Sequence, residues 1–326
     1  MTATRRRTSR RLGGAAAGLL ADRLLGEPPT AWHPVAGFGR VMTRLEPVMY
    51  RDDRRVGVAF AAVGVGAGAL AGRAAGSTAV SVAVASSGRL LRQTARAVAA
   101  ALTRGDVDAA RAVLPSLVGR DPRALDPPRI VAATVESVAE NTVDAVVAPA
   151  LFRAVLGAPG AAAHRAANTL DAMVGHPDVR YQRFGWAGAH LDDVAAYVPA
   201  RVTALLVCAA RPTRAADVLH AVRRDAPAHP SPNAGVAEAA FAAALGIELG
   251  GPTRYPTHLE HRPRLGTGPR PSVADIERAV RLADEIEWLL VVLLLAAALV
   301  TARGASGASP PPADHAAVVR TRKGSR

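Results

Sequence analysis

The strongest constraint on the fold of this chain is an apolar run near its C-terminal end. Residues 288–302 read W-L-L-V-V-L-L-L-A-A-A-L-V-T-A and are followed by Arg303. A helix needs roughly 20 apolar residues to cross a bilayer, and tryptophan and arginine favour the two interfaces. Because a flanking arginine can extend to the headgroups, this run predicts a membrane-spanning helix.

Four other segments show the same pattern. Residues 56–72 and 74–88 are uncharged and are separated by Arg73, and weaker candidates occupy 145–157 and 202–210. A core helix of a soluble protein would explain any one of them, whereas all of them together favour several membrane segments. No strand pattern is long enough to build a sheet. We therefore predict an all-α polytopic integral membrane protein with about four to five membrane segments.

The charge of the chain is strongly basic and comes almost entirely from arginine. The formal net charge is +13, and Lys323 is the only lysine. Such a charge suits anionic lipid, nucleic acid or an anionic substrate, or it reflects scattered solvated side chains. The N-terminal R-R-R-T-S-R-R precedes a short apolar stretch, as in a signal peptide, but we find no convincing A-x-A cleavage site before Asp22. We expect a first membrane-associated helix held by these arginines.

Missing residues and motifs narrow the chemistry. Cys208 is the only cysteine, so neither an intramolecular disulfide nor a zinc site with two thiolates is possible. The sequence contains no Walker loop, Rossmann glycine fingerprint, H-E-x-x-H or G-x-S-x-G motif. Any ATP that the protein uses is therefore bound without a Walker loop.

The polar regions define the expected organisation. We predict one membrane-embedded unit over 1–303, with cytoplasm-facing or interfacial loops over 89–135 and 211–287. A helix is expected over 273–287, directly before the apolar run. Residues 304–326 are rich in Gly, Ser and Pro and then basic, which predicts a disordered tail.

One acidic motif stands at the start of an apolar segment. Glu136, Glu140 and Asp144 are spaced i, i+4, i+8, with Asn141 near the same helix face. Carboxylates aligned in this way repel one another unless a cation lies between them, and Mg²⁺, an ammonium group or an arginine cluster would serve. The alternative is a solvated acidic helix face. The adjoining apolar residues favour a functional role, because acids at a membrane boundary are costly.

Three further polar sets accompany this motif. His164, Asn168 and Asp171 share one helix face by their i, i+4 and i, i+3 spacings. A second set in L-D-D-V-A-A-Y-V-P-A-R contains Asp192, Asp193 and Arg201. The third lies in a proline-bracketed loop, H-P-S-P-N, and contains His229 and Asn233, followed by Glu238 on a helix. Helix capping alone would explain Asn233.

Seven long motifs lie between about residues 15 and 300. In chain order they are D-R-L-L-G-E-P-P-T-A-W-H-P-V, L-V-G-R-D, V-E-S-V-A-E-N-T-V-D-A-V-V-A-P, N-T-L-D-A-M-V-G, F-G-W-A-G-A-H-L-D-D-V, V-P-A-R-V-T-A and H-P-S-P-N-A-G-V-A-E-A-A-F-A-A-A-L-G. Together they resemble the CobD/CbiB family of cobalamin-biosynthesis proteins. The resemblance implies a multi-pass adenosylcobinamide-phosphate synthase of the cell membrane. Such an enzyme joins adenosylcobyric acid to (R)-1-amino-2-propanol O-phosphate, or a related amino alcohol, through a new amide.

The chain departs from the family pattern at a few positions. Ala145 stands where the family usually has glycine, and Val236-Ala237 stands where it has Trp-Pro. His164-Arg165 replaces an aromatic-Lys/Arg pair. The charged and amide residues of the motifs are retained.

The implied reaction requires an activated carboxylate, hence ATP and Mg²⁺, with acids for the metal and arginines for phosphate. We expect Glu136, Glu140 and Asp144 to hold Mg²⁺ or the incoming ammonium group. Competing metal ligands are Asp171, Asp192 and Asp193. The candidate phosphate clamps are Arg201 and Arg120, of which Arg201 is favoured. The candidate proton acceptors are His33, His229 and Glu238. The residues expected to bond substrate amides are Asn141, Asn168 and Asn233.

Two other classes of function stay open. A membrane scaffold could gather corrinoid-pathway enzymes, which are also candidate partners of a synthase, but a scaffold needs none of these acids, amides and histidines. A transporter of a corrinoid or another anion would need polar residues within several spans. Here the acidic clusters lie at segment edges and in loops. The partners implied are the corrinoid, the amino-alcohol phosphate and the lipid bilayer, and no nucleic acid.

Overall fold

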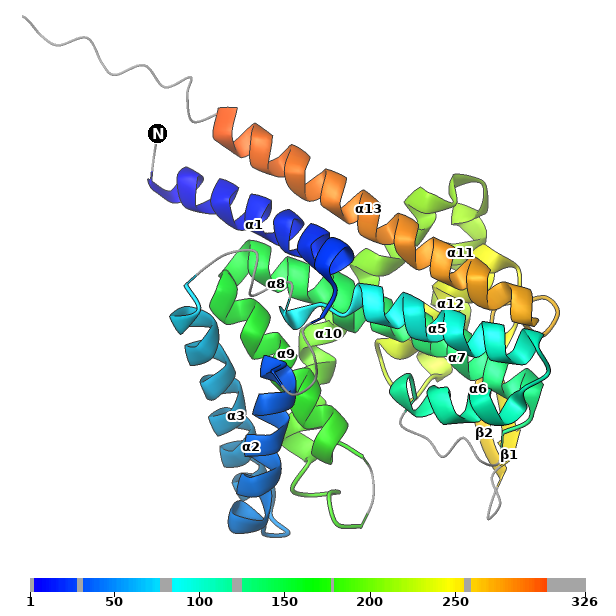
Figure 1. Cartoon of the computed structure of the whole chain (residues 1–326), viewed down its shortest axis with the longest axis horizontal. Coiled ribbons are helices and arrows are strands. Elements are labelled where there is room, and N and C mark those ends of the chain that lie inside the picture. The colour runs from blue at the N-terminus through cyan, green and yellow to red at the C-terminus, as the bar shows by residue number, and fades with distance from the viewer. Residues whose placement is uncertain are drawn as a thin grey trace, which may run out of the picture.

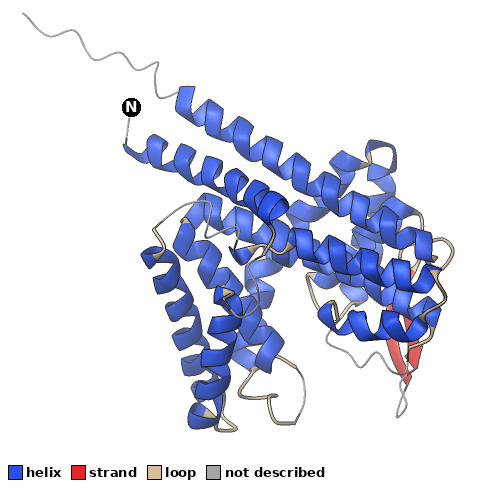
Figure 2. Ribbon diagram, in the orientation of Figure 1, coloured by secondary structure: helices blue, strands red, loops and turns tan. Residues whose placement is uncertain are grey.

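The computed structural model describes residues 3–27, 32–76, 84–118, 125–176, 179–254 and 259–303. Most of these residues are helical (Figure 2). The main elements are α1 (Ala3–Leu25), α2 (Pro34–Met49), α3 (Arg54–Ala74), α5 (Gly88–Thr103), α6 (Val107–Val113), α7 (Pro127–Thr142), the π-helical turn η3 (Val143–Val147), α8 (Ala148–Leu156), α9 (Ala158–Val174), α10 (Trp186–Ala210), α11 (Ala215–Asp225), α12 (Ala234–Leu245), β1 (Leu249–Arg254), β2 (Leu259–Leu265) and α13 (Val273–Arg303). Short 3₁₀ turns occupy Leu114–Ser116, Pro212–Arg214 and Ala226–Ala228.

The helices form two groups joined by α1 and α13 (Figure 1). In one group, α2, α3 and α9 pack together. The other contains α5, α6, α7, α11 and α12 with the hairpin β1–β2, and α10 packs against members of both. The regions predicted as polar loops therefore fold largely into the second group, as helices that pack on one another.

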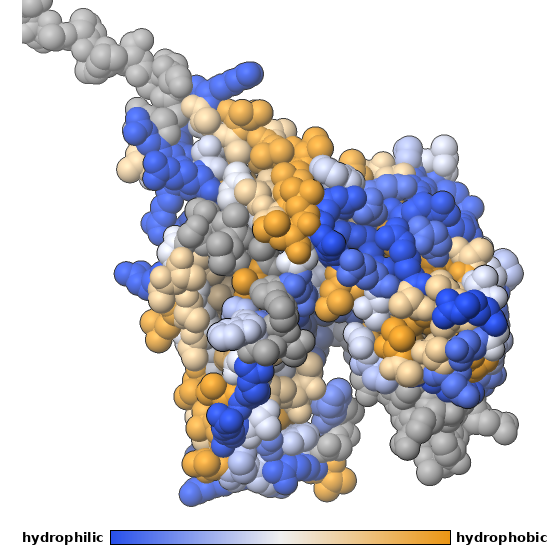
Figure 3. Space-filling model, in the orientation of Figure 1, coloured by the Kyte–Doolittle hydropathy of each residue, from blue (hydrophilic) through white to orange (hydrophobic). Residues whose placement is uncertain are grey.

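Three of the described helices, α3, α10 and α13, are long and apolar enough to cross a membrane. They contain the predicted segments 56–72, 202–210 and 288–302, and α13 presents a band of hydrophobic side chains on the surface (Figure 3). The prediction of an all-α polytopic membrane protein is confirmed. The polar helix expected at 273–287 and the apolar run are one 31-residue helix, because no Gly or Pro separates them.

Two details differ from the sequence expectation. The segment 145–157 is divided between η3 and α8, and α8 has only nine residues, too few to cross a bilayer alone. The hairpin β1–β2 was not predicted, because its glycines and prolines conceal any alternation. Part of the segment 74–88 lies outside the described residues. The whole tail 304–326 lies outside them as well.

Small residues allow α3 and α9 to approach closely. A Cβ atom added at Gly68 would lie 2.7 Å from the Cβ of Ala166 and 2.9 Å from the carbonyl oxygen of Ala162. One turn later, a Cβ at Gly72 would lie 2.6 Å from the carbonyl oxygen of Ala158. Such small-residue contacts are how helices associate in membranes, where there is no hydrophobic drive between them. The glycines therefore set the α3–α9 distance.

Gly68→Val is expected to destabilise the protein by about 1–3 kcal/mol, because the new side chain overlaps α9 backbone. Gly66→Val is the matched control, since a Cβ at Gly66 meets nothing within 4 Å. Both changes alter helix propensity equally, so only the packing differs. Thermal unfolding in detergent measures the difference. Equal melting temperatures for the two variants would contradict the packing argument.

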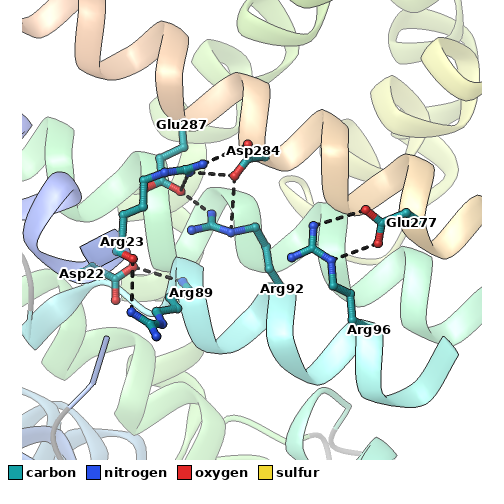
Figure 4. Close-up of polar contacts among 8 residues, drawn as sticks. All are labelled: Asp22, Arg23, Arg89, Arg92, Arg96, Glu277, Asp284 and Glu287. Atoms are coloured by element: carbon teal, nitrogen blue, oxygen red, sulfur yellow. Dashed lines mark hydrogen bonds and ion pairs between the residues drawn. The ribbon is translucent and has the colours of Figure 1, made fainter. Parts of the chain in front are cut away.

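Ion pairs connect α1, α5 and α13 (Figure 4). Arg23 of α1 donates to Asp284 of α13 at 2.7 Å and covers the ring of Trp288, with 4.6 Å from its guanidinium carbon to the ring centroid. Arg92 of α5 donates to Glu287 of α13, and both side chains are buried. The Nε of Arg92 also lies 3.5 Å from Asp284. These pairs neutralise charges where the three helices meet.

Arg92→Met is expected to cost up to about 3–5 kcal/mol of stability, because it removes the nearer charge partner of buried Glu287 and leaves it with Nη1 of Arg23, 3.6 Å away. Changing both residues, to Met and Leu, should recover much of that loss. Arg96→Met is the control: its pair with Glu277 is exposed, and removal should cost at most about 1 kcal/mol. Urea unfolding in detergent micelles measures the free energy of unfolding of each variant. A single variant as stable as the double variant would contradict the expectation.

Candidate functional site

The acidic motif lies where α7 becomes the π-helical turn η3. Helix α7 begins after Asp126, whose carboxylate accepts from the Arg129 N–H at 3.1 Å, and Glu136 and Glu140 follow in regular helix. Asp144 lies within η3. A π-turn adds one residue to the turn, and such turns are frequent at functional sites. The regular i, i+4, i+8 face is therefore interrupted at Asp144, and the three carboxylates have different neighbours.

Glu136 holds the hairpin β1–β2 against α7. Its Oε1 accepts from the N–H of Gly250 at 3.1 Å, and its Oε2 lies 3.8 Å from Nη1 of Arg262. Gly250 has φ +67°, and a side chain there would overlap the carbonyl oxygen of Pro263. Glu136 is buried and has these two partners, so the chain itself satisfies this carboxylate.

Glu140, Glu238 and His229 form a second group. Burial, followed by the charge of Glu140 and a hydrogen bond with it, raises the pKa of Glu238 well above its usual value. The Nε2 of His229 lies 3.5 Å from Oε1 of Glu238, and its Nδ1 accepts from the Ser231 N–H at 3.1 Å. Burial lowers the pKa of His229. The surroundings therefore favour the protonated form of Glu238 and the neutral form of the imidazole beside it.

Asp144 faces α9 and α10. Its Oδ2 accepts from Nδ2 of Asn168 at 3.2 Å, and Arg165 donates to the Asn168 oxygen at 3.3 Å. Burial, and next the carboxylate of Glu140, raise the pKa of Asp144 to about 7, while Arg165 and Asn168 oppose the shift. Asp192 is near enough to interact electrostatically with Asp144, and its Oδ1 is buried without a hydrogen-bond partner.

One cavity of about 520 Å³ brings six of the predicted residues together. Its polar lining residues are Glu140, Asp144, Asp171, Asp192, Asp193, Ser231 and Asn233. They come from α7, η3, α9, α10 and the loop before α12. Within the described part of the chain, no three His, Cys, Asp or Glu side chains are arranged to hold a metal ion by themselves. The cavity is acidic and open to a cation that brings further ligands of its own.

Asn233 occupies the N-cap position of α12 but does not cap the helix with its side chain. Its amide donates to the carbonyl of Asp193 at 2.7 Å and accepts from Arg201 at 2.9 Å. Ser231 supplies the cap, because its Oγ accepts from the N–H groups of Asn233 and Ala234 at 3.3 and 3.2 Å. The capping interpretation of Asn233 is wrong, since its side chain instead joins the loop to α10.

Arg201, the favoured phosphate clamp, reaches Asn233 and stacks on Tyr197, with its guanidinium carbon 3.6 Å from the ring centroid. It does not line the cavity. Arg120, the other candidate clamp, lies outside the described residues. Arg201 could therefore contact a substrate phosphate only after its hydrogen bond to Asn233 breaks. Otherwise a different arginine must bind the phosphate.

Other predicted residues do not line the cavity. Asn141 donates to the carbonyl of Ser137 at 3.0 Å and so turns back onto its own helix. His33 accepts from the Val35 N–H at 3.2 Å as the N-cap of α2, and its Nε2 lies 3.6 Å from Glu27. Burial lowers the pKa of His33. His164 stacks on Phe152, with ring centroids 4.9 Å apart.

Three residues of this region were not singled out from the sequence as site residues: Arg165, Ser231 and Arg262. The Nε of Arg165 is buried without a hydrogen-bond partner, and the residue also lines an apolar cavity of about 200 Å³ between α2, α3 and α9. The position of Arg165 directly before the asparagine motif could have identified it as a site residue. Arg262 had none, because it lies on a strand that was not predicted.

Residues 15–283 match the family described as CobD/Cbib protein. The chain belongs to this family. A relative in Mycobacterium tuberculosis (strain ATCC 25618 / H37Rv) is 48% identical over 287 residues, covering 84% of this chain and 91% of the relative. Relatives in Chromobacterium violaceum and Geobacter metallireducens are 44% and 42% identical, cover 83% and 84% of this chain, and are themselves covered to 91% and 92%. All three are named Cobalamin biosynthesis protein CobD. No solved structure matches the chain.

Proposed function

We propose that this chain is an adenosylcobinamide-phosphate synthase of the cell membrane. It would act in cobalamin biosynthesis and condense adenosylcobyric acid with (R)-1-amino-2-propanol O-phosphate or a related amino alcohol. The bond formed is an amide between a corrin propionate and the amine. The observation that carries the proposal is the acidic cavity between α7, α9, α10 and α12 in a chain of the CobD/Cbib family.

The cavity suits the charged end of the amine substrate. Five carboxyl groups line about 520 Å³, which is in the usual range for a small-molecule site. An amino-alcohol phosphate fits this volume, whereas the corrin macrocycle does not, so only the propionate arm enters. Carboxylates attract the ammonium group and orient it. The same carboxylates disfavour a bare phosphate unless a divalent cation accompanies it.

Mg²⁺ is the cation that fits these residues. It commonly uses one or two protein carboxylates and takes its other ligands from waters and nucleotide phosphates. Asp144 and Asp192 would hold it, because both line the cavity and Oδ1 of Asp192 is buried without a partner. With ATP, the metal would supply charge neutralisation for turning the propionate oxygen into a leaving group. Acyl phosphate and acyl adenylate are both compatible with this arrangement.

The protein's own groups can handle the amine proton. An alkyl ammonium must lose a proton before its nitrogen attacks. His229 is neutral because burial lowers its pKa, so its imidazole can accept that proton. Glu140 lines the cavity and is hydrogen-bonded to Glu238, which lies 3.5 Å from His229. The three groups therefore offer a path that carries the proton from the cavity into the protein.

The test is a turnover assay on membranes from cells that express the chain. Adenosylcobyric acid, ATP, Mg²⁺ and aminopropanol phosphate are supplied, and the condensed product is sought by mass. We expect an ATP-dependent product that vector-only membranes lack. Absence of product with intact protein, after ethanolamine phosphate and the free amino alcohols are also tried, would instead favour a scaffold or a transporter.

Glu140→Gln is expected to lower turnover at least tenfold, because it removes a carboxylate at the cavity wall and the hydrogen bond between the two carboxyl groups of Glu140 and Glu238. Glu136→Gln is the matched comparison, since Glu136 contacts the hairpin and does not line the cavity. We expect it to affect stability more than turnover per folded molecule. The turnover rates of both variants are measured over a range of Mg²⁺ concentrations. Unchanged turnover and Mg²⁺ dependence in Glu140→Gln would remove Glu140 from the site.

A further inference from the structure

A second large cavity lies away from the acidic one, at the N-terminal end of α1. It measures about 520 Å³ and is bounded by α1, the end of α3 and the turn between α8 and α9. Six arginines line it: Arg6, Arg7, Arg10, Arg11, Arg73 and Arg153. None of the described residues that line it is acidic. Hydrophilic residues are visible at this end of α1 in Figure 3.

The arginines converge on the α8–α9 turn. A Cβ atom added at Gly157 would lie 3.3 Å from Nη1 of Arg153 and 3.4 Å from Nε of Arg11. The φ of Gly157 is +84°, so the turn itself requires glycine. Nη1 of Arg11 donates to the carbonyl of Val155 at the end of α8. Two guanidinium groups from distant parts of the chain are therefore held close together.

This concentration of charge calls for an anion. Like charges at short range repel, and the repulsion is strongest where low-dielectric protein surrounds them. The N-terminus of α9 begins at Ala158 on the cavity wall, so its helix dipole adds positive potential. Arginine side chains match phosphate oxygens with paired hydrogen bonds. The cavity thus has the chemistry of a phosphate site.

Its surroundings identify the source of the phosphate. Leu156, which lines the cavity, and its neighbour Val155 are 54% and 66% exposed, and Leu70, one turn before Arg73 on α3, is 68% exposed. The spanning helix α3 ends at Ala74 and its last turn lines the cavity. The end of α13 lies beside α1, because Ser9 donates to the carbonyl of Ala298 at 3.0 Å. Exposed apolar side chains at the ends of membrane helices are where acyl chains lie, and basic pockets between such helices bind lipid headgroups.

We propose that this arginine cavity binds the headgroup phosphate of an anionic phospholipid, with the acyl chains along Leu70 and Leu156. The site is separate from the acidic cavity and shares no lining residue with it. It anchors α1, α3 and α9 to one leaflet at a fixed depth. The proposal does not depend on the reaction that the chain catalyses.

The test measures lipid preference in the purified full-length protein in an uncharged detergent. Phosphatidylglycerol and phosphatidylcholine with identical acyl chains are titrated, and bound lipid is counted by native mass spectrometry. We expect phosphatidylglycerol to bind at least tenfold more tightly and to raise the melting temperature. The triple variant R7Q/R10Q/R73Q should lose this preference. All three arginines are exposed, so the fold should tolerate the change.

The control variant R44Q/R104Q/R223Q removes the same charge from exposed arginines outside the cavity and should keep the preference. R7K/R10K/R73K should retain part of it, because lysine binds phosphate as a point charge. Equal loss in the control would show a general charge effect and overturn the proposal. Inorganic phosphate at the same concentration should not raise the melting temperature. An increase equal to that caused by phosphatidylglycerol would assign the cavity to a free anion and overturn the lipid assignment.

Discussion

The cost of placing charge among apolar helices organises this structure. A buried carboxylate or guanidinium is tolerated only when a partner offsets its lost hydration. Arg92 and Glu287 meet this requirement between α5 and α13, and Arg23 with Asp284 meets it between α1 and α13. The same pairs fix how the polar helical group sits on the spanning helices. Charge pairing therefore determines the frame on which the two cavities are built.

The carboxylates differ in whether the chain itself provides their partners. Glu136 has the Gly250 N–H and Arg262, whereas Asp192 has a buried oxygen with no partner. Groups satisfied within the protein contribute to folding, and groups left unsatisfied toward a cavity are available to a ligand. This distinction separates Glu136 from Glu140, although both belong to the same acidic motif in the sequence. It places the proposed chemistry at Glu140, Asp144 and Asp192 and gives Glu136 a structural role.

Features with a local sequence signal were predicted, and features that depend on tertiary contacts were not. The apolar runs at 56–72 and 288–302 predicted α3 and α13, because membrane insertion depends mainly on local composition. Asp144 and Asp193 were singled out in two separate polar sets, and the structure places both of them in one cavity. The π-turn at Asp144 was not predicted, and η3 packs against α8 and α10. The cap from Ser231 rather than Asn233 likewise depends on Arg201, 32 positions away from Asn233.

The continuity of α13 has a mechanical consequence. Its 31 residues extend over about 46 Å without a Gly or Pro at which to bend. Its apolar half exposes Leu293 and Leu299 and contacts α1, and the helix also packs against α7 and α12, whose residues line or adjoin the acidic cavity. A rigid rod transmits tilt from one end to the other. A change in bilayer thickness that tilts the apolar half would therefore shift α7 and α12, so membrane thickness would be a variable in the spacing of the cavity walls.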